Sequence, residues 1–208
     1  MEYKGLPVLL LDIVDDPTHE TGISENAIVD DPAIKLSFIA FNDQPRLQQF
    51  AVASEDRRII TGPLLVPDQP VYRNDKKGEY YAMFTRDAVE RTALKFFRQG
   101  NGNKVNLMHN TGELVSDIVL FESFIYDTSR GVQPVKGFEG VPEGTWFVSY
   151  KVDNEKVWQD IKDGTFKGFS MQGLFNHITT EDDEAELAEL RATAELLRDK
   201  LRQVVEKI

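Results

Sequence analysis

The sequence contains no cysteine, and this absence removes several kinds of chemistry at once. Disulfide bonds, thiolate metal sites and a cysteine nucleophile are all excluded. A chain without cysteine is also typical of a reducing compartment. Long apolar runs are absent too, because the longest, Val8 to Leu11, is far too short to cross a bilayer. The start of the chain lacks the basic residues and the long apolar stretch of a signal peptide, so we expect a protein without a membrane partner.

Positive charge is scarce, with 24 lysines and arginines against 35 acidic residues and a formal net charge of −11. Nucleic acid would repel such a chain, because phosphate binding needs a basic face, and we expect no nucleic-acid partner. The acidic clusters at 15–16, 30–31 and 181–184 are typical of solvated surface. The sequence has no paired histidines at metal-binding spacing and no calcium-loop motif, so we expect neither a metal nor another cofactor.

Short apolar segments bounded by glycine and proline predict a series of strands. We expect strands at residues 35–41, 59–67, 80–84, 104–109, 117–126, 145–152 and 166–178. Apolar residues at helical spacing predict a helix that begins after a cap at Thr85 and ends at Gly100. A shorter helix is expected at 154–162, capped by Asp153. Glycines and prolines at 127–144 indicate a loop.

Many short strands with turn signals between them favour a barrel or a sandwich, so the expected fold is mainly β with a few helices. The last part of the chain differs, because residues 180–208 contain neither proline nor glycine. Apolar residues there alternate at spacings of three and four, which is a heptad pattern. This tail is interpreted as an amphipathic helix that either forms a coiled coil or lies on the domain. The expected organisation is a domain over 1–178 and a helical segment over 179–208.

Histidine is the usual general base for a serine nucleophile, and the chain has only three histidines to consider. His19 stands in a polar, turn-like stretch and is interpreted as a surface residue. His109 ends a predicted strand, on the same face as Val105 and Leu107. A histidine next to apolar positions is more often a buried structural residue than a catalytic one.

Ser170 has glycine two residues before it and three residues after it. Glycine permits the close backbone approach that an oxyanion site requires. The segment is not a nucleophile elbow, because Gln172 stands where glycine is needed and the context is that of a strand. Taken alone, Ser170 is best interpreted as an ordinary strand serine. His177 is unsuited as its base, because strand alternation places the two side chains on opposite faces.

A catalytic histidine usually needs a third group that fixes its tautomer and orientation. Glu122 stands inside an apolar strand, where a carboxylate is costly unless it is paired. An outward-facing strand residue is an equal alternative for this position. Asp117, at the start of the strand, and Glu113, in the preceding loop, are weaker candidates for the same role.

Several segments, in this order, resemble the phage serine proteases related to the prohead proteases of tailed bacteriophages. The segments are 29–33, 60–73, 107–110, 121–124 and 144–173. Each motif is short, and the specificity lies in their order and combination. The resemblance implies a fold similar to that of herpesvirus assemblins, which is an antiparallel β-barrel surrounded by helices. It leaves out the heptad tail, for which we expect scaffold binding or self-association.

The resemblance also implies roles for individual residues. Ser170, in a G-x-S context, corresponds to the nucleophile, and His109 corresponds to the base that closes an earlier strand. The third member varies among relatives, being a histidine in the herpesvirus enzymes and an acidic residue in the phage enzymes. Because no histidine is suitably placed after Ser170, Glu122 is the inferred third member.

These observations together predict a serine endopeptidase that works without a cofactor and associates with copies of itself. The resemblance implies scaffold and capsid precursor proteins as its substrates. It further implies that cleavage takes place inside the immature phage head in the host cytoplasm and that the protease also processes itself. The alternative is a β-barrel protein of head assembly that binds scaffold or has a structural role and is catalytically inert. A small ligand-binding barrel explains neither the motif order nor the tail.

Overall fold

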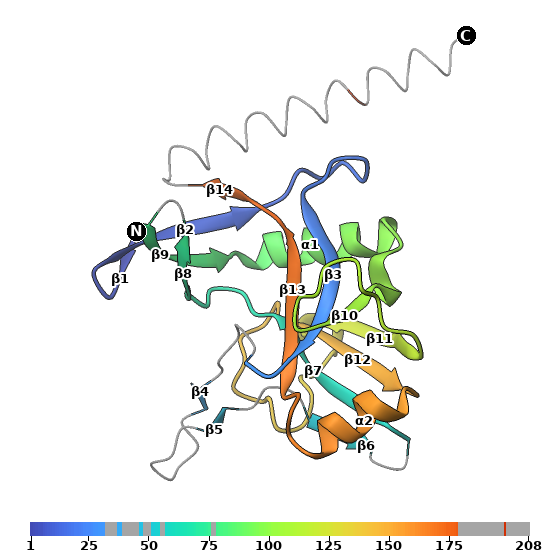
Figure 1. The fold of residues 1–208 in the computed structure, drawn as a ribbon. Helices are drawn as coiled ribbons and strands as arrows, with labels where there is room; N and C mark the ends of the chain where they lie inside the picture. The colour runs from blue at the N-terminus through green and yellow to red at the C-terminus, as the bar shows by residue number, and fades with distance from the viewer. Residues whose placement is uncertain are drawn as a thin grey trace.

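The computed structural model describes residues 1–31, 37–38, 46–47, 51–54, 57–75, 78–178 and 198. These residues form a mainly β fold with two α-helices, as Figure 1 shows. The predicted helical tail, apart from Arg198, lies outside the described residues, and so does most of the strand predicted at 35–41. No helix in the described part of the chain is long and apolar enough to cross a membrane.

The largest sheet has five strands and contains the start of the chain. Its strands are β1 (Glu2–Tyr3), β2 (Leu6–Asp12), β9 (Gly78–Phe84) and β8 (Val71–Asp75) in that order, with β14 (Asn176–Ile178) also paired to β2. Strands β2 and β9 run parallel, whereas the other pairs are antiparallel.

A four-stranded antiparallel sheet forms the opposite side of the fold. Its order is β11 (Ile118–Ile125), β12 (Trp146–Val152), β7 (Ile59–Leu65) and β6 (Ala51–Ser54). Strand β7 continues through Pro63. Among the described residues, β6 pairs with β7 only as far as Thr61, so the missing N–H of Pro63 removes no bond to the described part of β6.

The third sheet has three strands in the order β10 (Val105–Leu107), β3 (Gly22–Val29) and β13 (Gly168–Leu174). The central strand β3 runs parallel to β10 and antiparallel to β13. In Figure 1 the orange β13 and the blue β3 lie side by side through the middle of the molecule. A separate antiparallel pair is formed by β4 (Ser37–Phe38) and β5 (Arg46–Leu47).

Helix α1 (Arg86–Arg98) begins and ends where the sequence predicts. The Thr85 hydroxyl accepts the Ala88 N–H at 3.2 Å, and Gly100 has a left-handed φ of 68° just after the last turn. Helix α2 (Glu155–Lys162) is also present, but its cap is Asn154 and not the predicted Asp153. Asn154 Oδ1 accepts the Val157 N–H at 3.1 Å. The two neighbouring residues are both good caps, so the sequence alone could not separate them.

The main hydrophobic core is enclosed by all three sheets and by both helices. Phe169 of β13 packs on Tyr150 of β12 with ring centroids 5.3 Å apart, and Phe96 of α1 packs on Trp146 of β12 at 5.4 Å. A smaller cluster around Phe147 lies on the other face of the four-stranded sheet. The three-stranded and the four-stranded sheets therefore each have one face toward the main core and one face away from it.

The prediction of a mainly β fold with helices is confirmed, whereas the closed antiparallel barrel is wrong for the described residues. Their strands form open sheets, and two of the pairings are parallel. The reason is visible after Leu174, where the predicted strand 166–178 divides. Its first part, β13, pairs with β3, and its second part, β14, pairs with β2 in a different sheet.

Candidate active site

Ser170 stands in a row of three residues that crosses the three-stranded sheet. It is opposite Ala27 of β3, and Ala27 is opposite Asn106 of β10. Residues paired in this way share one face of a sheet. The neighbouring residues Phe169 and Ile28 belong to the main core. Ser170, Ala27 and Asn106 therefore lie on the face that points away from the core, which we call the outer face.

Asn106 of this row forms a polar cluster on the outer face with Glu25 and Gln172. Asn106 Nδ2 donates to Glu25 Oε2 at 2.5 Å and lies 3.5 Å from Gln172 Oε1. Because both neighbours are acceptors, they fix the orientation of the Asn106 amide. Asn106 is fully buried, and its Oδ1 has no donor among the described residues. An unpaired buried acceptor costs about 1–3 kcal/mol, so this oxygen is a position where a further donor would be favourable.

His109 lies in a tight turn and not in the predicted strand, because β10 already ends at Leu107. Met108 and His109 both have left-handed φ values, of 54° and 60°, and the Asn110 N–H donates to Leu107 O at 3.0 Å. This is the pattern of a type I′ turn, whose central positions normally hold glycine or asparagine. A left-handed conformation costs about 1–2 kcal/mol for a residue with a Cβ. The chain therefore bears a local cost to present an exposed histidine.

The His109 turn is tied to the strand of Ser170 by side-chain hydrogen bonds. Gln172 Nε2 donates to Thr111 Oγ1 at 2.6 Å, and Thr111 Oγ1 donates to His109 O at 3.4 Å. Gln172 lies two residues after Ser170 and so shares its face. The structure thus brings the segments of Ser170 and His109 together on the outer face. Among the described residues, no hydrogen bond joins the His109 ring to Ser170 Oγ.

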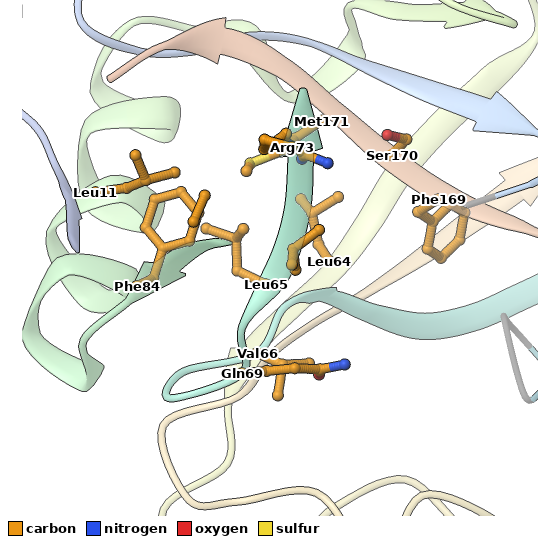
Figure 2. A pocket seen from close by; sticks show the side chains of 12 residues that line it. Leu11, Leu64, Leu65, Val66, Gln69, Arg73, Phe84, Phe169, Ser170 and Met171 are labelled. Atoms are coloured by element: carbon orange, nitrogen blue, oxygen red, sulfur yellow. The ribbon is translucent and has the colours of Figure 1, made fainter. Parts of the chain in front are cut away.

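The Ser170 hydroxyl remains accessible to solvent and is not used in a hydrogen bond within the described fold. The residue is 8% exposed, and its Oγ makes no hydrogen bond to any described residue. It also lines an apolar pocket on the β7 side of β13, shown in Figure 2. Catalytic hydrogen bonds are often long or absent before substrate binds, so the missing bond to His109 is compatible with a general-base role.

Glu122 is placed elsewhere, on β11 of the four-stranded sheet. It is opposite Ser149 and shares the face of Phe147, which points away from the main core. The side chain is exposed and forms no hydrogen bond or ion pair with the described residues. The structure therefore does not bring Glu122 to the outer face that carries Ser170, and its role as the third member stays a prediction.

The two weaker acidic candidates lie between the His109 turn and β11. Asp117 precedes β11 with a φ of 61°, and its side chain accepts a hydrogen bond from Ser116 Oγ at 2.9 Å. Its backbone oxygen accepts from Asp153 and Asn154. Glu113 is exposed, and its N–H donates to Asn110 O at 3.1 Å. Both residues thus have local backbone roles in shaping this connection.

The other two histidines lie outside the three-stranded sheet that carries Ser170. His177 lies on β14 in the five-stranded sheet and packs edge to face on Tyr80, with ring centroids 5.9 Å apart. His19 is exposed, as predicted, and its Nδ1 accepts the Thr21 N–H at 3.2 Å. Of the three histidines, His109 is the one that the fold brings near the serine strand.

Strand β3 is held in place by a polar contact through the core. Asn26 Nδ2 donates to the Tyr150 hydroxyl of β12, in a short hydrogen bond. Tyr150 is fully buried, and this burial raises the pKa of its phenol far above the ordinary value. The phenol therefore stays neutral, and the contact fixes the central strand of the candidate site against the four-stranded sheet.

Sequence reasoning missed four residues of the outer face, namely Glu25, Asn106, Thr111 and Gln172. A signal existed for two of them, because Glu25 and Asn106 interrupt the apolar strands β3 and β10. Glu122 interrupts an apolar strand in the same way. The contacts among these residues join positions up to 81 residues apart, and local periodicity contains no information about such pairs.

Comparison with known protein families gives a match, which covers most of the described fold. Residues 47–179, which are more than half of the chain, match the family described as "Putative phage serine protease XkdF". The match includes Ser170, His109, Thr111 and Gln172, and it begins after β3. Neither the curated proteins nor the solved structures give a match. The chain therefore belongs to the family described as putative phage serine protease XkdF.

Proposed function

We propose that this chain is a serine endopeptidase with Ser170 as nucleophile and His109 as general base. One observation carries the proposal: the Gln172–Thr111 hydrogen bond joins the turn of His109 to the strand of Ser170 on the outer face. Family membership supports the reaction class, because the matched family is named for serine proteases. The unpaired Ser170 hydroxyl also supports it, since a nucleophile must be free to meet substrate.

In the proposed reaction, Ser170 Oγ attacks the carbonyl carbon of a peptide bond. His109 accepts the hydroxyl proton and later donates it to the departing amine, a contribution of about 10²–10⁴ in rate. The exposed ring of His109 can change its rotamer when a peptide binds, because its side chain has no hydrogen bond to the described residues. Backbone N–H groups of β13 or of a neighbouring loop hold the oxyanion.

Two acidic groups compete for the role of stabilising the charged imidazole. Glu122 is the third member inferred from the sequence, but it stands on the four-stranded sheet. Glu25 stands on the outer face and binds Asn106, three residues before His109. Asn106 Oδ1 is a buried acceptor without a donor among the described residues, and a ring N–H of His109 would supply one. We therefore favour Glu25, acting through Asn106, as the orienting group.

The substrates we propose are scaffold and capsid precursors, cut during maturation of the phage prohead, and this protein itself. Family membership supports a phage role. The position of β13 supports binding of an extended chain, because β13 is an edge strand of its sheet. A peptide can add to such an edge as a further strand.

The test is co-expression of the full chain with the scaffold and capsid precursor proteins of the same phage. We expect the wild type to shorten these proteins at defined sites, and Ser170→Ala to leave them at full length. Processing that persists in Ser170→Ala would disprove the nucleophile assignment. If the wild type leaves the head proteins intact and binds them, the chain is instead an inert scaffold-binding protein.

A further inference from the structure

An apolar pocket opens beside Ser170, between β13, β7 and the end of the five-stranded sheet (Figure 2). Its apolar wall is formed by Leu11, Leu64, Leu65, Phe84, Phe169 and Met171. In the figure, Ser170 stands on β13 between Phe169 and Met171, so the nucleophile is part of the pocket wall. A peptide whose carbonyl reaches Ser170 would therefore lie beside this pocket.

The pocket leaves apolar surface open next to a reactive group. Exposed apolar surface costs about 25 cal/mol per Å², and a side chain that enters the pocket recovers this free energy. Small-molecule and substrate sites typically combine such apolar walls with few polar groups. The composition of this wall therefore favours an apolar occupant.

The polar groups of the pocket narrow the choice of occupant further. Gln69, in the loop between β7 and β8, has a buried Oε1 with no donor among the described residues. This oxygen can accept an N–H from the backbone of a bound peptide. Arg73 of β8 also lines the pocket, whereas no aspartate or glutamate among the described residues does. A lysine or arginine side chain would meet a like charge without a compensating carboxylate.

We infer that this pocket is the specificity pocket of the protease and binds an uncharged apolar side chain adjacent to the bond that is cut. Gln69 Oε1 accepts a backbone N–H of the same peptide. The inference rests on the proposed function, because it takes Ser170 as the nucleophile. It adds a substrate class to that function: peptides with an aliphatic or aromatic residue at the cleavage position.

The experiment uses peptidyl diphenyl phosphonates, which react covalently with an active serine. Four compounds differ only in the side chain next to phosphorus, namely the side chains of alanine, leucine, phenylalanine and lysine. The rate constant for modification of Ser170 is measured by mass spectrometry on the full chain. We expect the leucine or the phenylalanine compound to react about tenfold faster than the alanine compound. The lysine compound should react more slowly than either of them.

Two variants connect the preference to the pocket. Ala82 of β9 is 4% exposed and lines the pocket, so Ala82→Leu fills it. Ala93→Leu is the matched control, because Ala93 is 6% exposed in α1 and lies outside the pocket lining. Val71→Phe is a second variant at a half-buried lining position of β8, where folding tolerates the ring better. Ala82→Leu and Val71→Phe should bring the rate ratio of large to small side chains near one, whereas Ala93→Leu should preserve it.

The outcomes separate this inference from the proposed function. If none of the compounds modifies Ser170, both fall. If the alanine compound modifies Ser170 as fast as the larger ones, the pocket inference falls and the protease function stands. The inference also falls if Val71→Phe and Ala82→Leu keep the wild-type ratio. Should Ala82→Leu fail to fold, Val71→Phe alone decides.

Discussion

The four-stranded and three-stranded sheets both bury serine side chains, but they treat them differently. In the four-stranded sheet, Ser149 of β12 and Thr61 of β7 are buried opposite each other, and their hydroxyl oxygens lie 2.9 Å apart in a hydrogen bond. In the three-stranded sheet, the Ser170 hydroxyl has no hydrogen bond to the described residues. On the same face, Asn106 Oδ1 has no donor in the described part of the chain.

The difference shows how a structural polar group can be distinguished from a functional one at similar burial. The Ser149–Thr61 pair satisfies itself and needs nothing further from outside. The outer face instead keeps an unpaired hydroxyl, an unpaired acceptor and a left-handed histidine within one region. The buried unpaired acceptor and the left-handed histidine are costs that persist at sites where a ligand or a reaction uses them.

The largest effect should come from replacing the two serines by alanine. Ser170→Ala should reduce hydrolysis by about 10³-fold or more, because it removes the nucleophile. Its free energy of unfolding should change little, since no hydrogen bond to the described residues is lost. Ser149→Ala should keep activity and lower the free energy of unfolding by about 1 kcal/mol, because Thr61 loses its partner. Cleavage assays measure the hydrolysis rate, and urea unfolding measures the free energy of unfolding. If Ser149→Ala loses activity and Ser170→Ala keeps it, the roles assigned to the two sheets are wrong.

Replacing His109 should lower the hydrolysis rate and raise the free energy of unfolding in the same variant. His109→Gly should lower the hydrolysis rate by about 10²-fold or more, because the general base is lost. It should raise the free energy of unfolding by about 1 kcal/mol, since glycine adopts the left-handed conformation without strain. His177→Gln serves as the control and should keep activity. An active His109→Gly variant would remove this residue from the mechanism.

The acidic partner can be identified by a matched pair of charge-removing variants. Glu25→Gln should lower the turnover rate about tenfold and leave KM nearly unchanged, because the imidazolium loses a stabilising charge. Glu122→Gln removes one carboxylate from the other sheet and should stay within about twofold of the wild type. The pH profile of turnover is measured for both. If Glu122→Gln shows the larger loss and shifts this profile, Glu122 is the orienting group and the assignment of Glu25 is wrong.

The smallest effect should come from loosening the His109 turn. Thr111→Val removes the hydroxyl that accepts from Gln172 and should lower turnover about threefold, since the base is held less firmly. Thr111→Ser keeps the hydroxyl and should restore the wild-type rate. Thermal unfolding of both variants should be similar, because Thr111 is exposed. Equal rates for the two variants would show that the hydrogen bond does not position His109.

Local sequence signals predicted most of the elements but little of the site. Thr85 and Gly100 delimit α1 because caps act within a few residues. The end of β10 was misplaced by two residues, because Met108 and His109 carry no signal for a type I′ turn. The division at Phe175 was missed as well, since the apolar alternation continues across it.

The row of Ser170, Ala27 and Asn106 could not be derived from sequence patterns. It depends on the register of β3 with two strands that follow it much later in the chain. Alternation shows which side chains of one strand share a face, but it does not say which strands are neighbours. Resemblance to a family supplied Ser170 and His109, and the three-dimensional structure was needed to find Glu25 and Asn106 beside them.

The most direct test of the central claim is reaction of the full chain with a small fluorophosphonate, followed by peptide mapping. Such a reagent modifies a serine only when a neighbouring base activates it. We predict a single adduct, located on Ser170, that is lost in His109→Gln. An adduct on another serine such as Ser149, or equal labelling of Ser170 with and without His109, would contradict the account.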